Sequence, residues 1–339
     1  MPSAMKMSKN SASLRLGKIP EDVLRRYVLK FVGKRRRDVL LPPSYGEDAG
    51  VVETSSNRIV VAVDPITGAR ELIGWLSVHI NANDVAVCGA EPRWFSSCIL
   101  LPKNASINDL KVITKQIHNA AKTLGIAVVT GHTEVAPYVT SPIVIGQMTG
   151  VLVTRKIITT SGARPGDYIV MTKTAGIEGT AILANDFEER LRKMGVPSSV
   201  IKDAKNYYRF ISVVKDALRL TKHAAVSSMH DPTEGGVIGG LYELSRASGC
   251  GFKVWREFIP VSKTTAEICR ALNVDPLKLI SSGVVLATVK KAERNILSRI
   301  GAKVIGKMTE KRNERLLIDK TRTVSIDEPV TDELWRILQ

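Results

Sequence analysis

A turn-rich segment, TSGARPGD at residues 160–167, divides the chain into two stretches of similar length. Clustered glycine and proline interrupt helices and strands and are typical of a connection between folding units. A single hydrophobic core stops growing at roughly 250–300 residues, and this chain has 339. We therefore predict two domains, at residues 19–157 and 158–339, preceded by a flexible arm at residues 1–18.

Each half alternates apolar runs of strand length with amphipathic segments of helix length. In the first half, RIVVAVD at 58–64 predicts a strand that ends on an acid, and 69–87 predicts a helix. In the second half, AAVSSMH predicts a strand that runs into HDPTEGG, and the periodicity predicts one long helix over 198–220. This alternation indicates layered α/β and α+β domains.

Composition removes several classes of protein. No segment approaches the roughly 18–20 apolar residues of a membrane span, and the first residues lack the apolar core of a signal peptide. We therefore expect a cytoplasmic protein that has no membrane partner. The four cysteines have no C-x-x-C spacing, which argues against zinc ribbons and redox motifs.

The net charge of +16 indicates an anionic ligand or an acidic partner without choosing between them. Nucleic acid is not the expected partner. Aromatic residues make up only 5% of the chain, and no recognition motif accompanies the charge.

The clearest chemical signal is the placement of acids beside small residues at the predicted ends of elements. These acids are Asp48, Asp64, Asp84, Glu134 and Asp231. Mg²⁺ takes oxygen ligands, usually one or two carboxylates together with water and substrate phosphates. Neither a Walker A sequence nor a G-x-G-x-x-G turn is present. The acids therefore predict that nucleotide phosphates are bound through metal.

Glycines and hydroxyl residues adjoin these acids and are suited to contact phosphate. They are Gly131, Thr133, Thr233, Gly235 and Gly236. No catalytic acid or base is singled out. His132 and His230 are interpreted as structural, because no serine or cysteine nucleophile is placed to use them.

Six motifs in a fixed order cover nearly the whole chain: GEDAGVV, VAVDPITG, NDVAVCGAEP, TGHTEV, RPGDYIVMTKTAGIEGTAIL and HDPTEGGVIGGLYELSRASG. In this order they resemble the aminoimidazole ribonucleotide (AIR) synthase superfamily, which includes AIR synthase, selenophosphate synthetase, thiamine-monophosphate kinase and HypE. The motifs are most similar to those of the HypE branch of hydrogenase maturation proteins.

The resemblance implies a two-domain AIR-synthase-like fold whose N-terminal strands form a β-barrel with a second subunit, and therefore a homodimer. It implies ATP and Mg²⁺ in the cleft between the domains. The implied metal ligands are Asp48, Asp64, Asp84 and Asp231. The implied nucleotide contacts are Asn83, Gly131, Thr133, Glu134, Thr233, Gly235 and Gly236.

The implied activity is ATP-dependent phosphorylation of an amide or carbamoyl oxygen, on a small molecule or on a partner protein. Two alternatives stay open: a small-molecule kinase similar to thiamine-monophosphate kinase, and an ATP-binding assembly or regulatory protein without turnover. HypE proper ends in a cysteine that carries the carbamoyl group, whereas this sequence ends in DELWRILQ. The self-modifying chemistry would therefore require another thiol to carry the carbamoyl group. Glu234 stands where HypE relatives often have arginine, and it predicts either a helix cap or a changed substrate.

Overall fold

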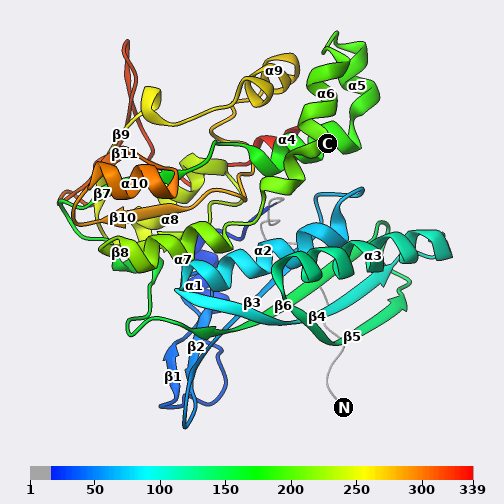
Figure 1. Ribbon diagram of the computed structural model, residues 1–339, viewed down its shortest axis with the longest axis horizontal. Coiled ribbons are helices and arrows are strands. Elements are labelled where there is room, and N and C mark those ends of the chain that lie inside the picture. The colour runs from blue at the N-terminus through cyan, green and yellow to red at the C-terminus, as the bar shows by residue number, and fades with distance from the viewer. Residues whose placement is uncertain (1–16, 339) are drawn as a thin grey trace.

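The computed structural model describes residues 17–338, so the predicted arm falls almost wholly outside the described residues. Each half of the described chain contains one β-sheet with its own helices (Figure 1). Before the first sheet comes a short helix, α1 (Glu21–Tyr27). The first sheet ends with β6 at Leu152 and the second begins with β7 at Tyr168, on either side of the turn-rich segment.

The first sheet has six strands in the order β1-β2-β3-β6-β4-β5. Every neighbouring pair is antiparallel except β4 and β5, which are parallel. The strands are β1 (Val39–Leu41), β2 (Gly50–Glu53), β3 (Arg58–Ile66), β4 (Ala90–Leu101), β5 (Ala127–Val135) and β6 (Ile143–Leu152). Helices α2 (Ile73–Val87) and α3 (Ile107–Leu124) lie across one face of this sheet (Figure 1).

The second sheet has seven strands in the order β13-β12-β9-β11-β7-β10-β8. Only β9 and β12 are parallel. Its strands are β7 (Tyr168–Thr172), β8 (Val226–His230), β9 (Gly251–Trp255), β10 (Leu286–Val289), β11 (Ala302–Thr309), β12 (Arg315–Ile318) and β13 (Thr323–Ser325). Its helices are α4 (Ile177–Asp186), α5 (Glu188–Lys193), α6 (Ser198–Lys205), α7 (Val214–His223), α8 (Gly236–Ser248), α9 (Lys263–Leu272), α10 (Arg294–Ile300) and α11 (Glu333–Leu338).

Helix α2 joins the cores of the two halves. Every one of its residues except Trp75 is buried, because one side faces the first sheet and another faces α7 of the second half. A helix that is covered all round is built mainly from apolar and small residues, and IGWLSVHINANDVAV fits this apart from the buried polar side chains of His79, Asn81, Asn83 and Asp84. Asp84 is therefore held rigidly at the boundary between the halves.

The prediction of one long helix over residues 198–220 is wrong. Helix α6 ends at Lys205, a 3₁₀ turn follows, and α7 begins at Val214. The buried amide of Asn83 explains the break: its Nδ2 donates to the carbonyl of Ile211 at 3.0 Å, and its Oδ1 accepts from the backbone N–H of Val213 at 2.8 Å. These contacts satisfy backbone groups that a continuous helix would have paired internally.

Two acids expected at strand ends lie inside strands instead. β3 continues past Asp64 to Ile66, and β5 continues past Glu134 to Val135. Pro65 is tolerated within β3 because β2 pairs only with residues 58–61, which leaves one side of the later part of β3 without a neighbouring strand. Proline within a sheet is found mainly in such edge positions.

Candidate functional site

The four acids predicted as metal ligands line one cavity of about 480 Å³ between the two halves. Asp48 precedes β2, Asp64 lies on β3 and Asp84 near the end of α2, while Asp231 directly follows β8. Thr233 and Glu234 also line this cavity. The structure thus brings together residues that are far apart in the sequence.

Burial and mutual repulsion raise the pKa values of three of these acids, Asp64, Asp84 and Asp231. Asp231 is 1% exposed, and neither carboxylate oxygen has a well-oriented hydrogen-bond donor among the described residues, although the amide of Asn83 lies beside it. Its burial, followed by the charge of Asp48, raises its pKa well above the ordinary value. Burial likewise raises the pKa of Asp84, with further contributions from Asp64 and Asp48. The pKa of Asp64 rises to about 6, again mainly through burial.

A cation would relieve this repulsion, and carboxylate oxygens suit Mg²⁺. Within residues 17–338, no three His, Cys, Asp or Glu side chains are grouped closely enough to hold a metal by themselves. Mg²⁺ in nucleotide sites commonly uses only one or two carboxylates and completes its shell with water and phosphate oxygens. The donor set therefore fits a metal that enters together with a nucleotide.

A chain of ion pairs crosses the cavity, and the sequence had not revealed it. Lys18 Nζ lies 2.8 Å from Glu243 Oε1, and Glu243 Oε2 lies 3.0 Å from His230 Nε2. His230 Nδ1 then lies 2.7 Å from Asp48 Oδ1. Among the described residues, Lys18 is the only lysine or arginine that lines the cavity. Nothing in the sequence around Lys18 marks it as functional.

Along this chain of ion pairs, each charged group stabilises the charged form of its neighbour. Burial lowers the pKa of His230, but Asp48 and Glu243 outweigh that effect and raise it to about 10. Burial raises the pKa of Glu243, whereas Lys18 and His230 bring it down to about 2. His230 is thus a buried imidazolium between two carboxylates. It keeps Asp48 in a defined orientation at the cavity wall.

Glu234 anchors the start of the described chain. Its Oε2 accepts from the backbone N–H of Lys18 at 2.8 Å, and this contact holds the Lys18 side chain over the acids. The adjacent Gly235 and Gly236 have positive φ angles of 79° and 63°. A Cβ at Gly236 would lie 2.6 Å from the carbonyl oxygen of Leu277. The positive φ angles and the close approach of other backbone atoms therefore explain why these two positions are glycine, without a contact to any ligand.

The other predicted nucleotide contacts do not line this cavity in the same subunit. Asn83 is fully buried and holds the turn before α7. Gly131, Thr133 and Glu134 lie on β5, where every residue is exposed. Asp64 on β3 pairs with Gly146 on β6, β6 is next to β4, and β4 pairs with Gly131 on β5. Asp64 and Gly131 are therefore three strand spacings apart, roughly 14 Å.

A second cavity of about 350 Å³ adjoins the first, and both are lined by Lys18, Asp64, Thr233, Glu234 and Trp335. Its most unusual lining residue is Glu178, near the start of α4. Glu178 is 2% exposed, and Ser282 lies beside its carboxyl and favours the charged form. Burial raises the pKa of this carboxyl to about 7. An acid within the otherwise apolar motif GIEGTAIL was the signal in the sequence that could have identified it.

Family models match both halves of the chain. The model described as AIR synthase related protein, N-terminal domain, matches residues 46–152. The corresponding C-terminal domain matches residues 164–319. The chain belongs to the AIR synthase-related family. The resemblance read from the six motifs is therefore confirmed, as is the two-domain α/β and α+β fold.

Curated relatives place this AIR synthase-related protein in the HypE-like branch. It is 31% identical to a carbamoyl dehydratase HypE of Azotobacter vinelandii over 73% of this chain and 72% of that protein. It is 27% identical to a putative hydrogenase expression/formation protein of Methanocaldococcus jannaschii, over 86% of this chain and 88% of the relative.

Solved structures of this family share the fold. HypE in a complex with HypF superposes with a TM-score of 0.72 at 23% identity, covering 91% of this chain and 99% of that one. A HypE complex with ATP superposes with a TM-score of 0.67 at 20% identity, covering 90% of this chain and 92% of that one. A ThiL complex with AMPPCP and TMP superposes with a TM-score of 0.74 at 18% identity, covering 95% of this chain and 100% of that one. No helix among residues 17–338 of the HypE-like protein has the length and apolar character needed to cross a membrane.

Proposed function

We propose that this HypE-like protein is an ATP- and Mg²⁺-dependent enzyme that phosphorylates the oxygen of an amide or carbamoyl group. The observation that carries the proposal is the convergence of Asp48, Asp64, Asp84 and Asp231, from both halves of the chain, on one cavity. The raised pKa values of Asp64, Asp84 and Asp231, and the buried carboxylate oxygens of Asp231, are what a cation-binding site has when no cation is bound.

Bound Mg²⁺ and ATP would supply the phosphoryl group and neutralise its charge. The side chains of this protein position the reactants. Asp48, oriented by His230, and the carboxylates of Asp64, Asp84 and Asp231 provide oxygen ligands. Lys18, held by Glu234 and Glu243, provides the nearby positive charge for the phosphate oxygens. Fixed charges of this kind account for most catalysis in phosphoryl transfer.

We place the amide or carbamoyl group on a separate molecule, because none of the four cysteines in the described chain lines either cavity. The relatives' names support a carbamoyl substrate. A protein carrier would be compatible with the structure in which HypE is bound to HypF.

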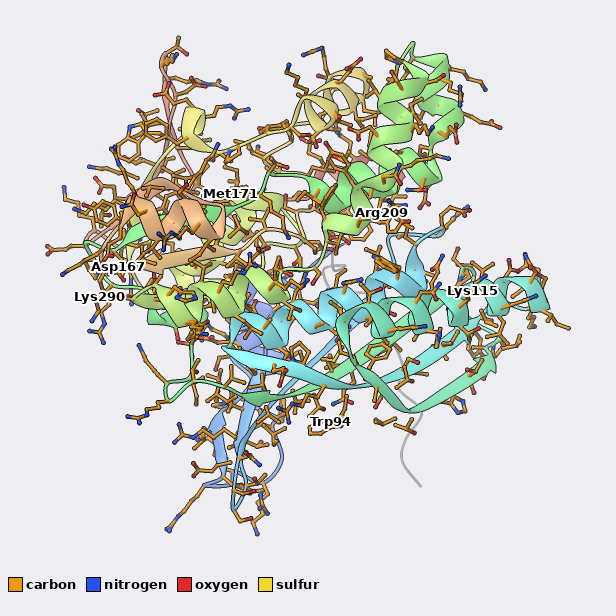
Figure 2. All side chains as sticks on the ribbon, in the orientation of Figure 1. Trp94, Lys115, Asp167, Met171, Arg209 and Lys290 are labelled. Carbon is orange, nitrogen blue, oxygen red and sulfur yellow. The ribbon has the colours of Figure 1, made fainter. Side chains whose placement is uncertain are left out.

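We further propose that the protein works as a homodimer built on the uncovered face of the first sheet. Trp94 projects from the face opposite α2 (Figure 2), whereas its neighbour Phe95 is fully buried. Val63 is 61% exposed and Val129, on the edge strand β5, is 55% exposed. An exposed apolar face with a long open edge strand is unusual for a monomer.

The dimer would also give Gly131, Thr133 and Glu134 a role. These residues are too far from the acids of their own subunit, so we propose that they contact the nucleotide of the partner. Mixing an Asp84→Asn subunit with a Glu134→Ala subunit would test this arrangement. Restored turnover in the mixture supports sites shared between subunits, and two inactive variants that stay inactive together argue against it.

The test of the proposed site is calorimetry with Mg²⁺ and AMPPCP. We expect Asp84→Asn to weaken nucleotide binding by about tenfold or more, because a direct metal ligand is lost. We expect the same change to raise the thermal midpoint without nucleotide, because one of the crowded carboxylates is removed. The exposed acid Glu310 provides the control, Glu310→Gln. Unchanged binding in Asp84→Asn would refute the site.

Product analysis separates the proposed activity from its alternatives. Release of ADP and phosphate together with dehydration of a carbamoyl or amide substrate supports the proposal. ADP with a stable phosphorylated small molecule indicates a kinase similar to thiamine-monophosphate kinase. Tight nucleotide binding with no turnover on any acceptor indicates an assembly or regulatory role.

A further inference from the structure

The stretch RRYVLKFVGKRRR at residues 25–37, which we call the basic segment, carries seven arginines and lysines and no acid. Within the described chain, Arg25 pairs with Glu21 and Arg36 pairs with Asp38, and the other cations of the segment have no carboxylate partner. The sixteen residues that precede Gly17 contain no acid either. The basic segment is therefore a concentrated and largely uncompensated positive charge.

Large apolar side chains are exposed among these charges. No residue of α1 is buried, and Tyr27 at its end is 60% exposed. Val28 is 50% exposed and Phe31 is 73% exposed. A patch that only keeps the protein in solution would need charge alone, whereas aromatic residues among arginines are characteristic of the centres of protein interfaces. The composition therefore indicates a surface that is covered by a partner.

The basic segment begins at the wall of the first cavity. Pro20, Glu21 and Leu24 line that cavity, and no residue of 25–37 does. Arg246 Nη2 on α8 lies 2.8 Å from Glu21 Oε2, and this ion pair ties α1 to the second half of the chain. A macromolecule bound to the basic segment would thus lie beside the cavity without filling it.

The aromatic rings of the segment argue against nucleic acid as the occupant. The guanidinium of Arg26 lies 5.7 Å from the ring centre of Tyr27, and Lys30 Nζ lies 5.0 Å from that of Phe31. A cation thus already covers one face of each ring, whereas single-stranded nucleic acid binds through bases stacked on open aromatic faces.

The backbone argues against a membrane surface. Helices that lie in a membrane interface present one continuous apolar face. Helix α1 has seven residues and ends at Tyr27, and the segment after Tyr27 is not helical. Five of the seven cations are arginines, whose planar guanidinium groups match carboxylates in two parallel hydrogen bonds. Carboxylates of a protein are therefore the favoured counter-charge.

We propose that the basic segment is the docking surface for a partner protein that presents clustered carboxylates around an apolar depression. The carboxylates pair with Arg26, Lys34, Arg35 and Arg37, and the depression receives the ring of Phe31. This interaction goes beyond the proposed function, because it does not depend on which reaction the acids of the cavity support.

The test is fluorescence anisotropy of the full-length protein with labelled peptides at physiological ionic strength. One peptide repeats Glu-Glu-Leu, and a second repeats Glu-Glu-Ser with the same length and charge. We expect the leucine peptide to bind about tenfold more tightly than the serine peptide, because only leucine can contact Phe31. Phe31→Ser should remove that preference. Absent binding of the leucine peptide, or a preference that survives Phe31→Ser, would overturn the proposal.

A pair of charge-matched variants locates the binding. The docking variant combines Arg26→Ser, Lys34→Ser, Arg35→Ser and Arg37→Ser. The control variant removes the same charge from exposed residues on and before α10, through Lys290→Ser, Lys291→Ser, Arg294→Ser and Arg299→Ser. We expect the docking variant to bind the leucine peptide about tenfold or more weakly, as for several exposed ion pairs lost together, and the control less than about twofold more weakly. Equal losses would show that binding follows net charge alone and would overturn the proposal.

Oligouridine, and vesicles of phosphatidylcholine with phosphatidylserine, test the other classes of partner. Either probe binding more tightly than the leucine peptide, and losing affinity in the docking variant alone, would reassign the segment to nucleic acid or to a membrane and overturn the proposal. The affinity for Mg²⁺ and AMPPCP should be the same in both variants as in the wild type, which also shows that they are folded. A wild-type protein that binds the peptide but not AMPPCP would refute the proposed function and leave the docking surface standing.

Discussion

Nδ1 of His230 lies 2.7 Å from Oδ1 of Asp48, and this contact ties the end of β8 in the second half to the loop before β2 in the first. His230 is 2% exposed, so the contact is shielded from solvent. Its other nitrogen meets Glu243, so the imidazolium holds a carboxylate on each side. The ion pair links the stability of the junction to the orientation of a proposed metal ligand.

Replacing His230 should destabilise the protein strongly. His230→Gln leaves Asp48 buried without its counter-charge and leaves Glu243 with Lys18 alone, and breaking a buried pair in this way costs about 3 kcal/mol. The pair of Arg93 with Glu91 is solvent-exposed, so Arg93→Gln should cost less than about 1 kcal/mol. Urea unfolding of both variants measures the difference. Equal losses would contradict the role of His230 at the junction.

The contribution of His230 should also depend on pH. Its pKa is raised from 6.5 to about 10 in the folded protein. The stabilisation is therefore fully present below 6.5 and is lost as the pH rises through about 10. The gap in unfolding free energy between wild type and His230→Gln should narrow over that window, and a constant gap would argue that the histidine is neutral.

The contribution of Asp64 to stability should also fall as the pH rises in the protein without nucleotide, but over a lower pH window. Its pKa is raised from 3.8 to about 6, so its contribution to folding is favourable below 3.8 and is lost as the pH rises through about 6. Asp64→Asn should raise the thermal midpoint above that window and have little effect below it. Adding Mg²⁺ and AMPPCP to the wild type should remove the advantage of the variant. A variant that is less stable at every pH would refute the repulsion.

Lys18 should matter for turnover more than for folding. Its side chain is half exposed but is the only cation from a lysine or arginine that lines the cavities in the described chain. Lys18→Gln should lower kcat by about a hundredfold, as for the loss of a single charge-stabilising donor, with little change in the thermal midpoint. Lys30→Gln, on an exposed residue, is the control. Steady-state kinetics with full activity in Lys18→Gln would remove it from the site.

The proposed dimer can be tested on its apolar face. Val63→Asp and Val129→Asp place charges on exposed positions of β3 and β5 and should shift the protein to monomers without unfolding it. Val153, which is 55% exposed in the connection after β6, provides the control Val153→Asp. Sedimentation velocity measures the outcome. A wild-type protein that is monomeric at micromolar concentration would contradict the dimer.

The acids show what could be predicted from the sequence. Asp48, Asp64, Asp84 and Asp231 each stand in a recognisable motif, so their chemistry and their family could be inferred from local residues alone. Asp64 was misplaced relative to its strand, because strand ends are set by which neighbouring strands pair. The predicted helix over 198–220 failed for a similar reason, since the amide of Asn83 breaks it from far away in the chain.

The sequence by itself determined the family, the two-domain α/β architecture and the acids, because motif order, hydrophobic periodicity and turn chemistry are local properties of the chain. Only the tertiary structure decided that Lys18, Glu243, His230 and Asp48 form one chain of charges, and that Glu178 lines a second cavity. These relationships depend on distance and burial. Both the distances and the burial arise when the two halves pack together around α2, and neither can be inferred from the spacing of residues in the sequence.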